Sequence, residues 1–421
     1  MEKLLLVGGD IATPDAINYC KEIGVYTIMT NDLPYANNPF KQMADEAWEI
    51  PVEELDVLEA KCREVGVTGV FAGVNEHNLD MAKALAERLG LPFYASDEAW
   101  ACARNKGLFK EHCIAVGLDV PKRYSVTPPI TAEMIADITF PVIVKPADSC
   151  GQQGLSVCYK EADLSVAYEK ALHFSTTKSV IVEDYIEGDE ITFPFLVMNG
   201  KPIINNTFLQ LPLNVNGRPT FSLIIDNISH WKRFEQKHSS HIHALMERLG
   251  CNNGIGVLQT IYKDGKYYFL EFGYRLDGMG GWRLDKKRTG FDACAYLVDT
   301  NLGHTLNHWS STVGNQNPPL LCATYLLYSN PGKVTKSVGL DEVKNRALIN
   351  VSYARFQEGS EVLPTGNMMQ TAYTIIFLGK DLNHLGNQLR FINETLHLYD
   401  ENGNDMLIYF DDYSIFEENP A

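Results

Sequence analysis

Short apolar runs alternate with amphipathic segments over the first hundred residues. Three of the runs have the length of buried strands: Lys3 to Val7, Val25 to Met29 and Val67 to Val74. Thr13 and Pro14 mark a helix start after the first run, and Gly24 marks its end. After the third run, apolar residues recur at helical spacing before Gly90: Leu79, Ala82, Leu85, Ala86 and Leu89. This alternation predicts a parallel sheet flanked by helices, with any ligand at the carboxyl ends of the strands.

Strand-like segments dominate from about Lys122 onward. They are Val142 to Lys145, Leu155 to Tyr159, Val180 to Val182, Ile191 to Met198 and a hairpin around Asp264-Gly265. The C-terminal segments are the strands Leu320 to Leu327 and Thr371 to Phe377 and one helix near Leu382 to Ile392. The pattern therefore predicts an α/β region followed by α+β regions, and 421 residues suggest two or three domains.

The charge balance excludes some partners. The chain has 36 Lys+Arg against 53 Asp+Glu, a formal net charge of -17, so we expect no nucleic-acid partner. The apolar run Leu4 to Val7 is too short for a signal-peptide core or a membrane span, which predicts a cytoplasmic protein with no membrane partner. The nine cysteines form no CxxC pair, so neither a zinc site nor a disulfide framework is indicated.

Gly8 and Gly9 follow the first strand and Asp32 follows the second, which is the arrangement of a dinucleotide-binding unit. The helix entry lacks the third glycine of that motif. A tight strand-to-helix turn is therefore the better interpretation of the two glycines.

A phosphate-binding arrangement is indicated between Phe140 and Val157. An apolar strand there carries Lys145 and leads through a turn containing Gly151 and Gly154 into a second strand. Glycines let backbone N–H groups approach phosphate oxygens, and a lysine adds a point charge for the same anion. A surface hairpin would explain the glycines, but it would not explain Lys145 in an otherwise apolar strand.

Three further segments carry charged residues at element ends. They are Val180 to Glu190 with its carboxylates, Tyr268 to Arg275 with an acid and a base four residues apart, and the helix start at Asn105-Lys106. In this order and spacing the four segments resemble the ATP-grasp superfamily, which includes biotin carboxylase, carbamoyl phosphate synthetase, D-alanine-D-alanine ligase and the L-amino acid ligases. The resemblance covers essentially the whole chain.

The resemblance implies an ATP-grasp fold, α/β plus α+β, with three parts. These are an N-terminal parallel-sheet domain at 1–104, an ATP-grasp domain at 105–315 with a mobile β-rich lid at about 122–195, and a C-terminal β-rich α+β subdomain at 316–421.

The resemblance also implies contacts for individual residues. Lys106 and Lys145 would bind the nucleotide phosphates beneath the lid loop Ser149 to Gly154, which includes Gly151 and Gln152. The remaining contacts would be Glu183 and the Ile186 backbone to adenine, Glu190 to ribose, Gln259 and Glu271 to metal, and Arg275 to the reacting carboxylate and phosphoryl group.

The implied activity is ADP-forming C–N ligation with ATP and Mg²⁺ as cofactors. ATP would activate a small-molecule carboxylate as an acyl phosphate, which an amine then attacks; positioning and charge neutralisation dominate such phosphoryl transfer. Amino acid or peptide ligation is favoured, while purine-pathway and carboxylase-type substrates stay open, as does a homodimer. Asn75-Glu76-His77 follows the third strand on the side where the resemblance puts the substrate.

Two positions depart from the family's metal motif. Gln259 stands where an acid is usual, and Gly273 stands where an asparagine is usual. Glu271 can still hold one magnesium ion, but support for a second ion is weak. A nucleotide-binding pseudoenzyme or regulatory protein therefore stays as an alternative, although the presence of Arg275 argues against it.

The hairpin between the two metal positions makes a geometric prediction. A plain two-residue turn at Asp264-Gly265 would pair Gln259 with Leu270 and leave Glu271 on the other face. A shared metal site requires an extra residue, most simply a bulged three-residue turn with Gly265 at positive φ.

His238, His241 and His243 precede a helix expected at Ala244 to Leu249. Because no Cys or Asp lies at ligand spacing, the cluster indicates a helix start rather than a metal site.

Overall fold

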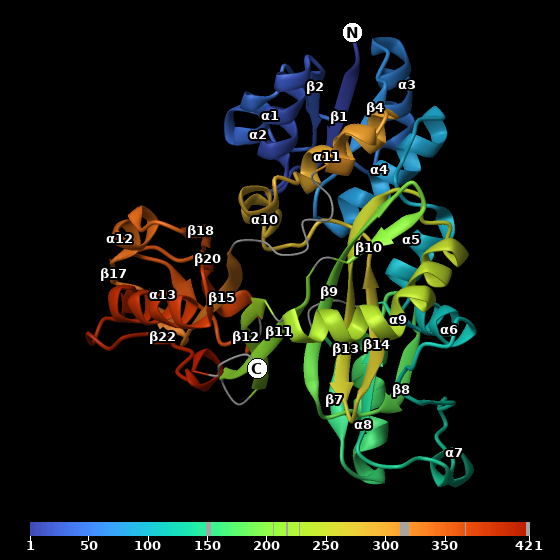
Figure 1. Cartoon of the computed structure of the whole chain (residues 1–421), viewed down its shortest axis with the longest axis vertical. Helices are drawn as coiled ribbons and strands as arrows, with labels where there is room; N and C mark the ends of the chain where they lie inside the picture. The colour runs from blue at the N-terminus through green and yellow to red at the C-terminus, as the bar shows by residue number, and fades with distance from the viewer. Residues whose placement is uncertain are drawn as a thin grey trace.

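The structure is a computed structural model that describes residues 1–148, 153–204, 206–215, 218–226, 228–311, 320–366 and 368–417. Its N-terminal part is a four-stranded parallel sheet with helices around it, at the top of Figure 1. The strand order is β3-β2-β1-β4, with β1 at Lys3–Val7, β2 at Tyr26–Thr30, β3 at Glu46–Trp48 and β4 at Gly69–Phe71. The helices are α1 (Thr13–Ile23), α2 (Pro39–Met43), α3 (Leu55–Val65), α4 (Glu76–Leu89) and α5 (Asp97–Arg104). The predicted parallel sheet is confirmed, although its last strand is shorter than the apolar run suggested.

Helix α4 illustrates how the apolar pattern builds this domain. The Asn75 side chain accepts a hydrogen bond from the Asn78 N–H at the helix start, and Gly90 ends the helix with φ 69°. The residues with no solvent exposure are Leu79, Ala82, Leu85 and Ala86, which share one core with the sheet residues Leu5 and Ile28. This packing fixes the first turn of α4, and with it Glu76, beside the carboxyl ends of the strands.

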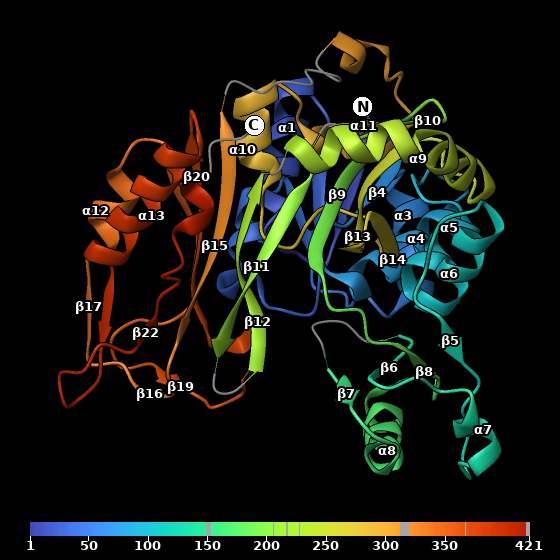
Figure 2. The ribbon, with the colours of Figure 1, turned by 60° about the horizontal axis from the view of Figure 1, so that its bottom comes forward.

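A second, small sheet extends away from the rest of the molecule, as Figure 2 shows. Its order is β5-β8-β6-β7, with β5 at Arg123–Tyr124, β6 at Val142–Pro146, β7 at Ser156–Cys158 and β8 at Val180–Asp184. Helices α7 (Ala132–Ala136) and α8 (Leu164–Phe174) complete this unit. It has its own core, which includes Val142, Val144 and Leu164. The small sheet falls within the range predicted for the lid, and its mobility stays a prediction.

A ten-stranded sheet forms the centre of the molecule, and its main path runs β14-β13-β9-β11-β12-β15-β20-β18. The strands up to residue 273 are β9 (Asp189–Met198), β10 (Lys201–Ile203), β11 (Phe208–Val215), β12 (Arg218–Asp226), β13 (Gly254–Lys263) and β14 (Lys266–Gly273). The later strands are β15 (Leu321–Ser329), β18 (Ile349–Ala354), β20 (Thr371–Gly379) and β22 (Leu407–Ile408). Since β9 belongs to this sheet, the predicted lid range of 122–195 crosses from one sheet into the other.

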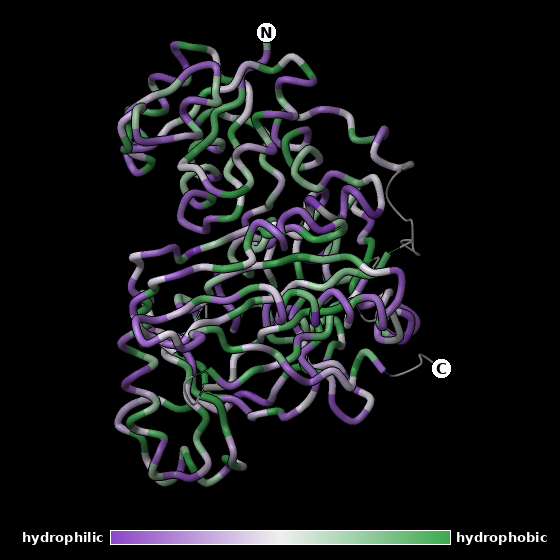
Figure 3. Tube along the Cα trace, turned by 90° about the vertical axis from the view of Figure 1, so that its left-hand side faces the viewer, coloured by the Kyte–Doolittle hydropathy of each residue, from purple (hydrophilic) through white to green (hydrophobic). Residues whose placement is uncertain are grey.

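Helices on the central sheet join it to the N-terminal domain. They are α6 (Lys106–Ala115), α9 (Ile228–Arg248), α10 (Trp282–Thr289) and α11 (Ala293–Leu302). One core includes residues of α1, β9, β13 and α11, and Asn301 of α11 donates to the Val70 carbonyl at 2.9 Å. Figure 3 shows apolar segments following the strands through the middle of the molecule. The expected helix start near Ala244 was wrong, because α9 begins at Ile228 and His238 lies inside it.

The C-terminal part shares the large sheet rather than forming a separate one. Helices α12 (Leu340–Asn345) and α13 (Leu382–Thr395) pack with β15, β18 and β20 in a core that includes Ile375, Phe377 and Leu389. Two short pairs lie beside it, β16 (Gly332–Lys333) with β19 (Glu361–Val362) and β17 (Lys336–Val338) with β21 (His397–Tyr399). The predicted domain boundary at 315/316 lies outside the described residues. Within the described part of the chain, no helix is long and apolar enough to cross a membrane.

Candidate active site

A cleft of about 530 Å³ lies between the small sheet and the large sheet. The small sheet contributes Lys145 and Glu183, the large sheet contributes Gln259 and Glu271, and α6 contributes Lys106. The cleft thus collects charged residues from segments that are up to 165 positions apart in the sequence (106 to 271). Its volume is in the range of small-molecule and cofactor sites.

Glu183 lies at the floor of the cleft between two lysines. The Lys145 Nζ is 2.6 Å from Glu183 Oε1, and the Lys110 Nζ donates to Oε2 of the same carboxylate. The side chains are almost fully buried, with 1% of Glu183, 5% of Lys110 and 11% of Lys145 exposed. A buried carboxylate between two ammonium groups satisfies the rule that buried charges are paired.

Burial and the neighbouring charges shift the pKa values of Lys110 and Glu183. Burial and the neighbouring Lys145 charge lower the pKa of Lys110 to about 8. Burial opposes ionisation of Glu183, but the Lys145 and Lys110 charges outweigh it and bring the Glu183 pKa below its ordinary value. The predicted role of Glu183 at adenine stays a proposal, since both carboxylate oxygens already accept from lysines.

Lys106 begins α6 and points toward the metal positions. The Asn105 side chain caps the helix by accepting from the Gly107 and Leu108 N–H groups, and the Lys106 N–H bonds the Ala147 carbonyl just beyond β6. The Lys106 Nζ then lies 3.4 Å from Glu271 Oε2. These contacts hold Lys106 and Lys145 around one space, as the phosphate assignment requires.

Gln259 and Glu271 are direct cross-strand partners on β13 and β14. The turn between them has two residues, Asp264 at φ 49° and Gly265 at φ 78°, so the expected three-residue turn was wrong. The extra residue is Leu270, at a register shift within β14. Because directly opposed residues share a face, Gln259 and Glu271 point the same way, and both line the cleft.

The donor set at this hairpin fits one magnesium ion. Glu271 offers a carboxylate and Gln259 offers an amide oxygen, both of which are hard ligands that Mg²⁺ accepts. Gly273 offers no side-chain ligand, and a Cβ added there would meet Val257 Cγ2 at 3.0 Å.

Arg275 follows β14 and contacts the N-terminal domain. Its Nη2 lies 3.0 Å from Glu76 Oε1, and its Nη1 donates to the Leu276 carbonyl at 2.9 Å. Arg275 therefore pairs with Glu76 of α4, while Glu271 pairs with Lys106. The Glu76–Arg275 pair lies where the N-terminal domain meets the central sheet.

The predicted nucleoside contacts lie at the other end of the cleft. Ile186 and Glu190 line it, and the Glu190 side chain is open to solvent there. Of the lid residues, Ser149, Gly151 and Gln152 lie outside the described residues. Gly154 has φ 75°, and a Cβ at this position would come within 2.8 Å of Pro146 and Phe174, so glycine is required.

The hydrogen bonds of Asp10 support the tight-turn interpretation of the N-terminal glycines. One Asp10 oxygen accepts from the Ala12 N–H at the start of α1, and the other accepts from the Val74 and Asn75 N–H groups. A protein carboxylate thus fills the position that a pyrophosphate would take at the helix start. A cavity of about 330 Å³ nearby includes Gly8, Gly9 and Asp32 in its lining, and no role was predicted for it.

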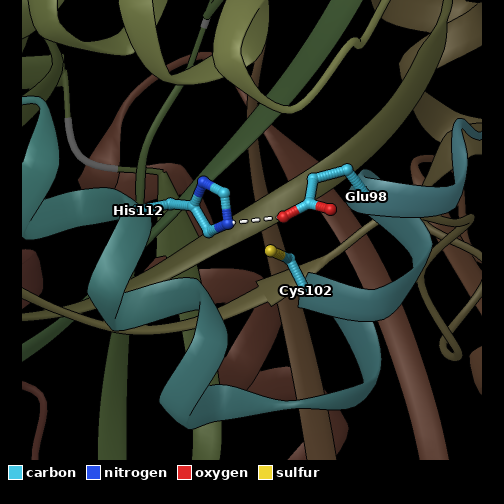
Figure 4. A group of neighbouring side chains, drawn as sticks. All are labelled: Glu98, Cys102 and His112. Carbon is cyan, nitrogen blue, oxygen red and sulfur yellow. Dashed lines mark ion pairs between the residues drawn. The ribbon is translucent and has the colours of Figure 1, made fainter.

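Glu98, Cys102 and His112 form a group with metal-ligand chemistry, drawn in Figure 4. The His112 Nδ1 accepts from the Arg248 Nε at 3.0 Å, so its Nε2 carries the proton and donates to Glu98 at 2.7 Å. Burial also raises the pKa of the Cys102 thiol to about 12. With both imidazole nitrogens bonded and the thiol protonated, the group joins α5, α6 and α9 as a hydrogen-bonded brace.

Sequence reasoning missed two residues of this site. Lys110 lies one helical turn after Lys106, and that spacing was the available signal for a second inward lysine. Arg104, whose Nη1 lies 2.5 Å from Glu76 Oε2, gave no such signal, since its partner is a residue of another element.

Comparisons with known proteins agree with this geometry. Residues 118–209 match the family model of the D-ala D-ala ligase C-terminus. The chain is 22% identical over 348 residues to the carbamoyl phosphate synthase large chain of Methanocorpusculum labreanum, with 76% of this chain and 32% of that protein covered. It thus spans about a third of the length of that relative.

Solved structures show the same fold. The L-amino acid ligase of Bacillus licheniformis superposes with a TM-score of 0.78 at 18% identity, covering 96% of this chain and 99% of that one. The biotin carboxylase domain of the Hydrogenobacter thermophilus 2-oxoglutarate carboxylase, solved with MgADP and bicarbonate, gives 0.74 at 18% identity, with 96% and 91% covered. The predicted resemblance is confirmed, and these relatives are ligases, synthases and carboxylases of the predicted class. The chain therefore has the ATP-grasp fold of these solved structures.

Proposed function

We propose that the protein is an ATP-dependent, ADP-forming carboxylate–amine ligase of the amino acid or peptide type. The observation that carries the proposal is the convergence of Lys106, Lys145, Gln259 and Glu271 on one cleft, with Arg275 beyond the end of the same hairpin. Lysines, a divalent ion and an arginine are the groups that phosphoryl transfer requires for positioning and charge neutralisation.

Each residue has a role in this proposal. Lys106 and Lys145 bind the phosphates, and Lys110 keeps Glu183 ionised beside Lys145. Glu183 and the Ile186 backbone contact adenine, and Glu190 contacts the ribose. The lid residues Ser149, Gly151, Gln152 and Gly154 cover the phosphates through backbone N–H groups.

Glu271 and Gln259 would hold one Mg²⁺, which supplies charge neutralisation to the nucleotide phosphates. Arg275 carries a fixed charge on a planar fork, so it can grip a carboxylate and then the equatorial oxygens of the transferred phosphoryl group. The resulting acyl phosphate is the species that the amine attacks. The amine adds at the acyl carbon, inorganic phosphate leaves, and the nitrogen loses its proton.

The proposal also retains the wider expectations from the sequence. These are the domain ranges 1–104, 105–315 and 316–421, a cytoplasmic location, small-molecule carboxylate and amine substrates, and no nucleic-acid partner. A homodimer stays open within it.

A screen for phosphate release tests the proposal. The protein is incubated with ATP, Mg²⁺ and pooled amino acids, and inorganic phosphate is measured. Release that requires the pool supports ligation and leads to the substrate by dividing the pool.

The weakened metal motif favours one alternative, a nucleotide-binding pseudoenzyme or regulatory protein. Gln259 contributes no charge and Gly273 contributes no ligand, so nucleotide binding without turnover is consistent with those two positions. Calorimetric ATP binding combined with no phosphate release on any substrate pool would favour this alternative.

A further inference from the structure

One carboxylate joins two guanidinium groups at the boundary between the N-terminal domain and the central sheet. Glu76 Oε1 accepts from Arg275, with Nη2 at 3.0 Å and Nε at 3.4 Å. Glu76 Oε2 accepts from the Arg104 Nη1 at 2.5 Å. The two oxygens of a single carboxylate are therefore divided between arginines of α5 and of the segment after β14.

Both arginines have other contacts that hold them. The Arg104 Nε donates to Asp80 Oδ1 at 3.0 Å, and its guanidinium lies 4.8 Å from the centre of the Trp100 ring. The Arg275 Nη1 donates to the Leu276 carbonyl. We expect this arginine pair, Arg104 and Arg275, to keep its arrangement when Glu76 moves away.

The three side chains are accessible enough for an exchange of ligands. The exposed fractions are 28% for Arg275, 37% for Glu76 and 25% for Arg104. The Asp226–Arg288 pair, with 1% of each side chain exposed, is by contrast closed to such an exchange. Glu76 is also ionised here: burial raises its pKa, but Arg275 and Arg104 more than offset that effect and lower it.

We propose that the arginine pair is a carboxylate-binding site that Glu76 occupies when no substrate is bound. The substrate carboxylate replaces Glu76, one oxygen on each guanidinium, so Arg104 is a second substrate-binding arginine beside Arg275. The inference rests on the proposed function, because it places the reacting carboxylate at Arg275. Glu76 sets the carboxylate affinity through competition, since every ligand must displace it.

The test measures carboxylate binding without any nucleotide, on the full-length protein, with ¹³C-labelled acetate as the probe. Binding is followed by NMR saturation transfer in the wild type and in Glu76→Gln. The glutamine removes the competing charge, and acetate affinity is expected to rise at least tenfold. Glu53→Gln is the matched control, because Glu53 pairs with His77 near the same helix start and contacts neither arginine. That variant should change acetate affinity less than twofold.

A double variant identifies the site of the gain. Glu76→Gln combined with Arg104→Gln should lose the added acetate affinity. Unchanged affinity in Glu76→Gln, or a gain that survives Arg104→Gln, would overturn the proposal and leave the cluster as a structural brace. If a thermal melt shows that Glu76→Gln does not fold, Glu76→Asp replaces it. The shorter acid cannot span both arginines, so we expect a smaller rise in acetate affinity than for glutamine. An unchanged acetate affinity in Glu76→Asp would contradict the proposal. Because no ATP is present, these results are independent of whether the protein releases phosphate.

Discussion

The Lys145 ammonium lies 2.6 Å from the Glu183 carboxylate, which also accepts from Lys110. A phosphate that enters the cleft therefore meets Lys145 already positioned by a buried acid. Lys145 lines the cleft directly, whereas Lys110 is 95% buried beneath it. This arrangement makes Lys145 the lysine whose loss should affect nucleotide binding most directly.

Lys145→Ala should weaken ATP binding at least tenfold, about 1.4 kcal/mol, because a phosphate loses its partner in a partly dry cleft. Isothermal calorimetry measures the affinity. Lys160→Ala is the control, since Lys160 is exposed on the same small unit and does not line the cleft. Equal ATP affinity in the wild type and Lys145→Ala would remove Lys145 from the site.

Restoring the family's metal ligands at positions 259 and 273 should raise the number of bound divalent ions. With the nonhydrolysable analogue AMPPNP, the wild type should bind one Mn²⁺ per chain, counted by electron paramagnetic resonance. Gln259→Glu with Gly273→Asn should bind two, because the pair adds one carboxylate and one amide oxygen. A Cβ at position 273 would lie 3.0 Å from Val257 Cγ2, so Val257→Ala is added to the double variant. Val257→Ala alone is the control. Two ions in the wild type would show that ligands outside this hairpin complete the site.

Turnover should depend on Arg275 far more than ATP affinity does. Arg275→Lys keeps the charge but loses the planar fork, and we expect at least a hundredfold lower kcat, roughly 2.7 kcal/mol of transition-state stabilisation. Glu271→Gln should lower it further, since it removes the carboxylate of the hairpin metal site. Steady-state kinetics on a substrate from the phosphate screen, with ATP affinity measured alongside, checks both variants. Near-normal turnover in both would contradict the proposed mechanism.

Burial of His238 is expected to make the protein less stable at acidic pH. It is buried inside α9, neither ring nitrogen has a hydrogen-bond partner, and burial, followed by the Lys237 and His241 charges, lowers its pKa to about 4. The unfolded chain titrates near 6.5, so between the two values it binds more protons than the native state. The neutral His238 ring therefore contributes fully to the free energy of unfolding above pH 6.5, and this contribution is lost as the pH falls toward 4.

His238→Phe should reduce that acid sensitivity by an amount on the order of 1 kcal/mol, since the ring would stay packed with Phe234 and Tyr267 but could not take up a proton. Urea unfolding at pH 7.5 and pH 5 measures the difference in unfolding free energy. His243→Phe, at an exposed position of the same helix, is the control. An equal loss of stability in the wild type and His238→Phe would mean that other groups dominate the acid response.

The apolar pattern predicted the N-terminal sheet well because parallel strands and their helices carry strong local signals. Leu4 to Val7 and the α4 residues Leu79, Ala82, Leu85 and Ala86 are buried as that pattern requires. Helix α9 was mostly missed, because its first turns are rich in His, Lys and Ser, which local spacing does not distinguish from a solvated loop.

Lys106, Lys145, Glu183, Gln259 and Glu271 line one cleft, yet their pairing was not readable from the sequence. The bulge at Leu270 has no composition signal, since a leucine in a strand looks ordinary, and it alone decides that Gln259 and Glu271 share a face. Likewise, Glu76 and Arg275 are 199 residues apart, and only the packing of α4 against its sheet brings them together.

The central claim is that ATP activates a carboxylate as an acyl phosphate. The most direct measurement is transfer of ¹⁸O from the labelled carboxylates of pooled amino acids to inorganic phosphate, followed by mass spectrometry. Attack of a carboxylate oxygen on the γ-phosphorus keeps that oxygen on the phosphoryl group when the amine displaces it. The account predicts phosphate carrying one ¹⁸O, and unlabelled phosphate, or ATP that stays intact with every pool, would contradict it.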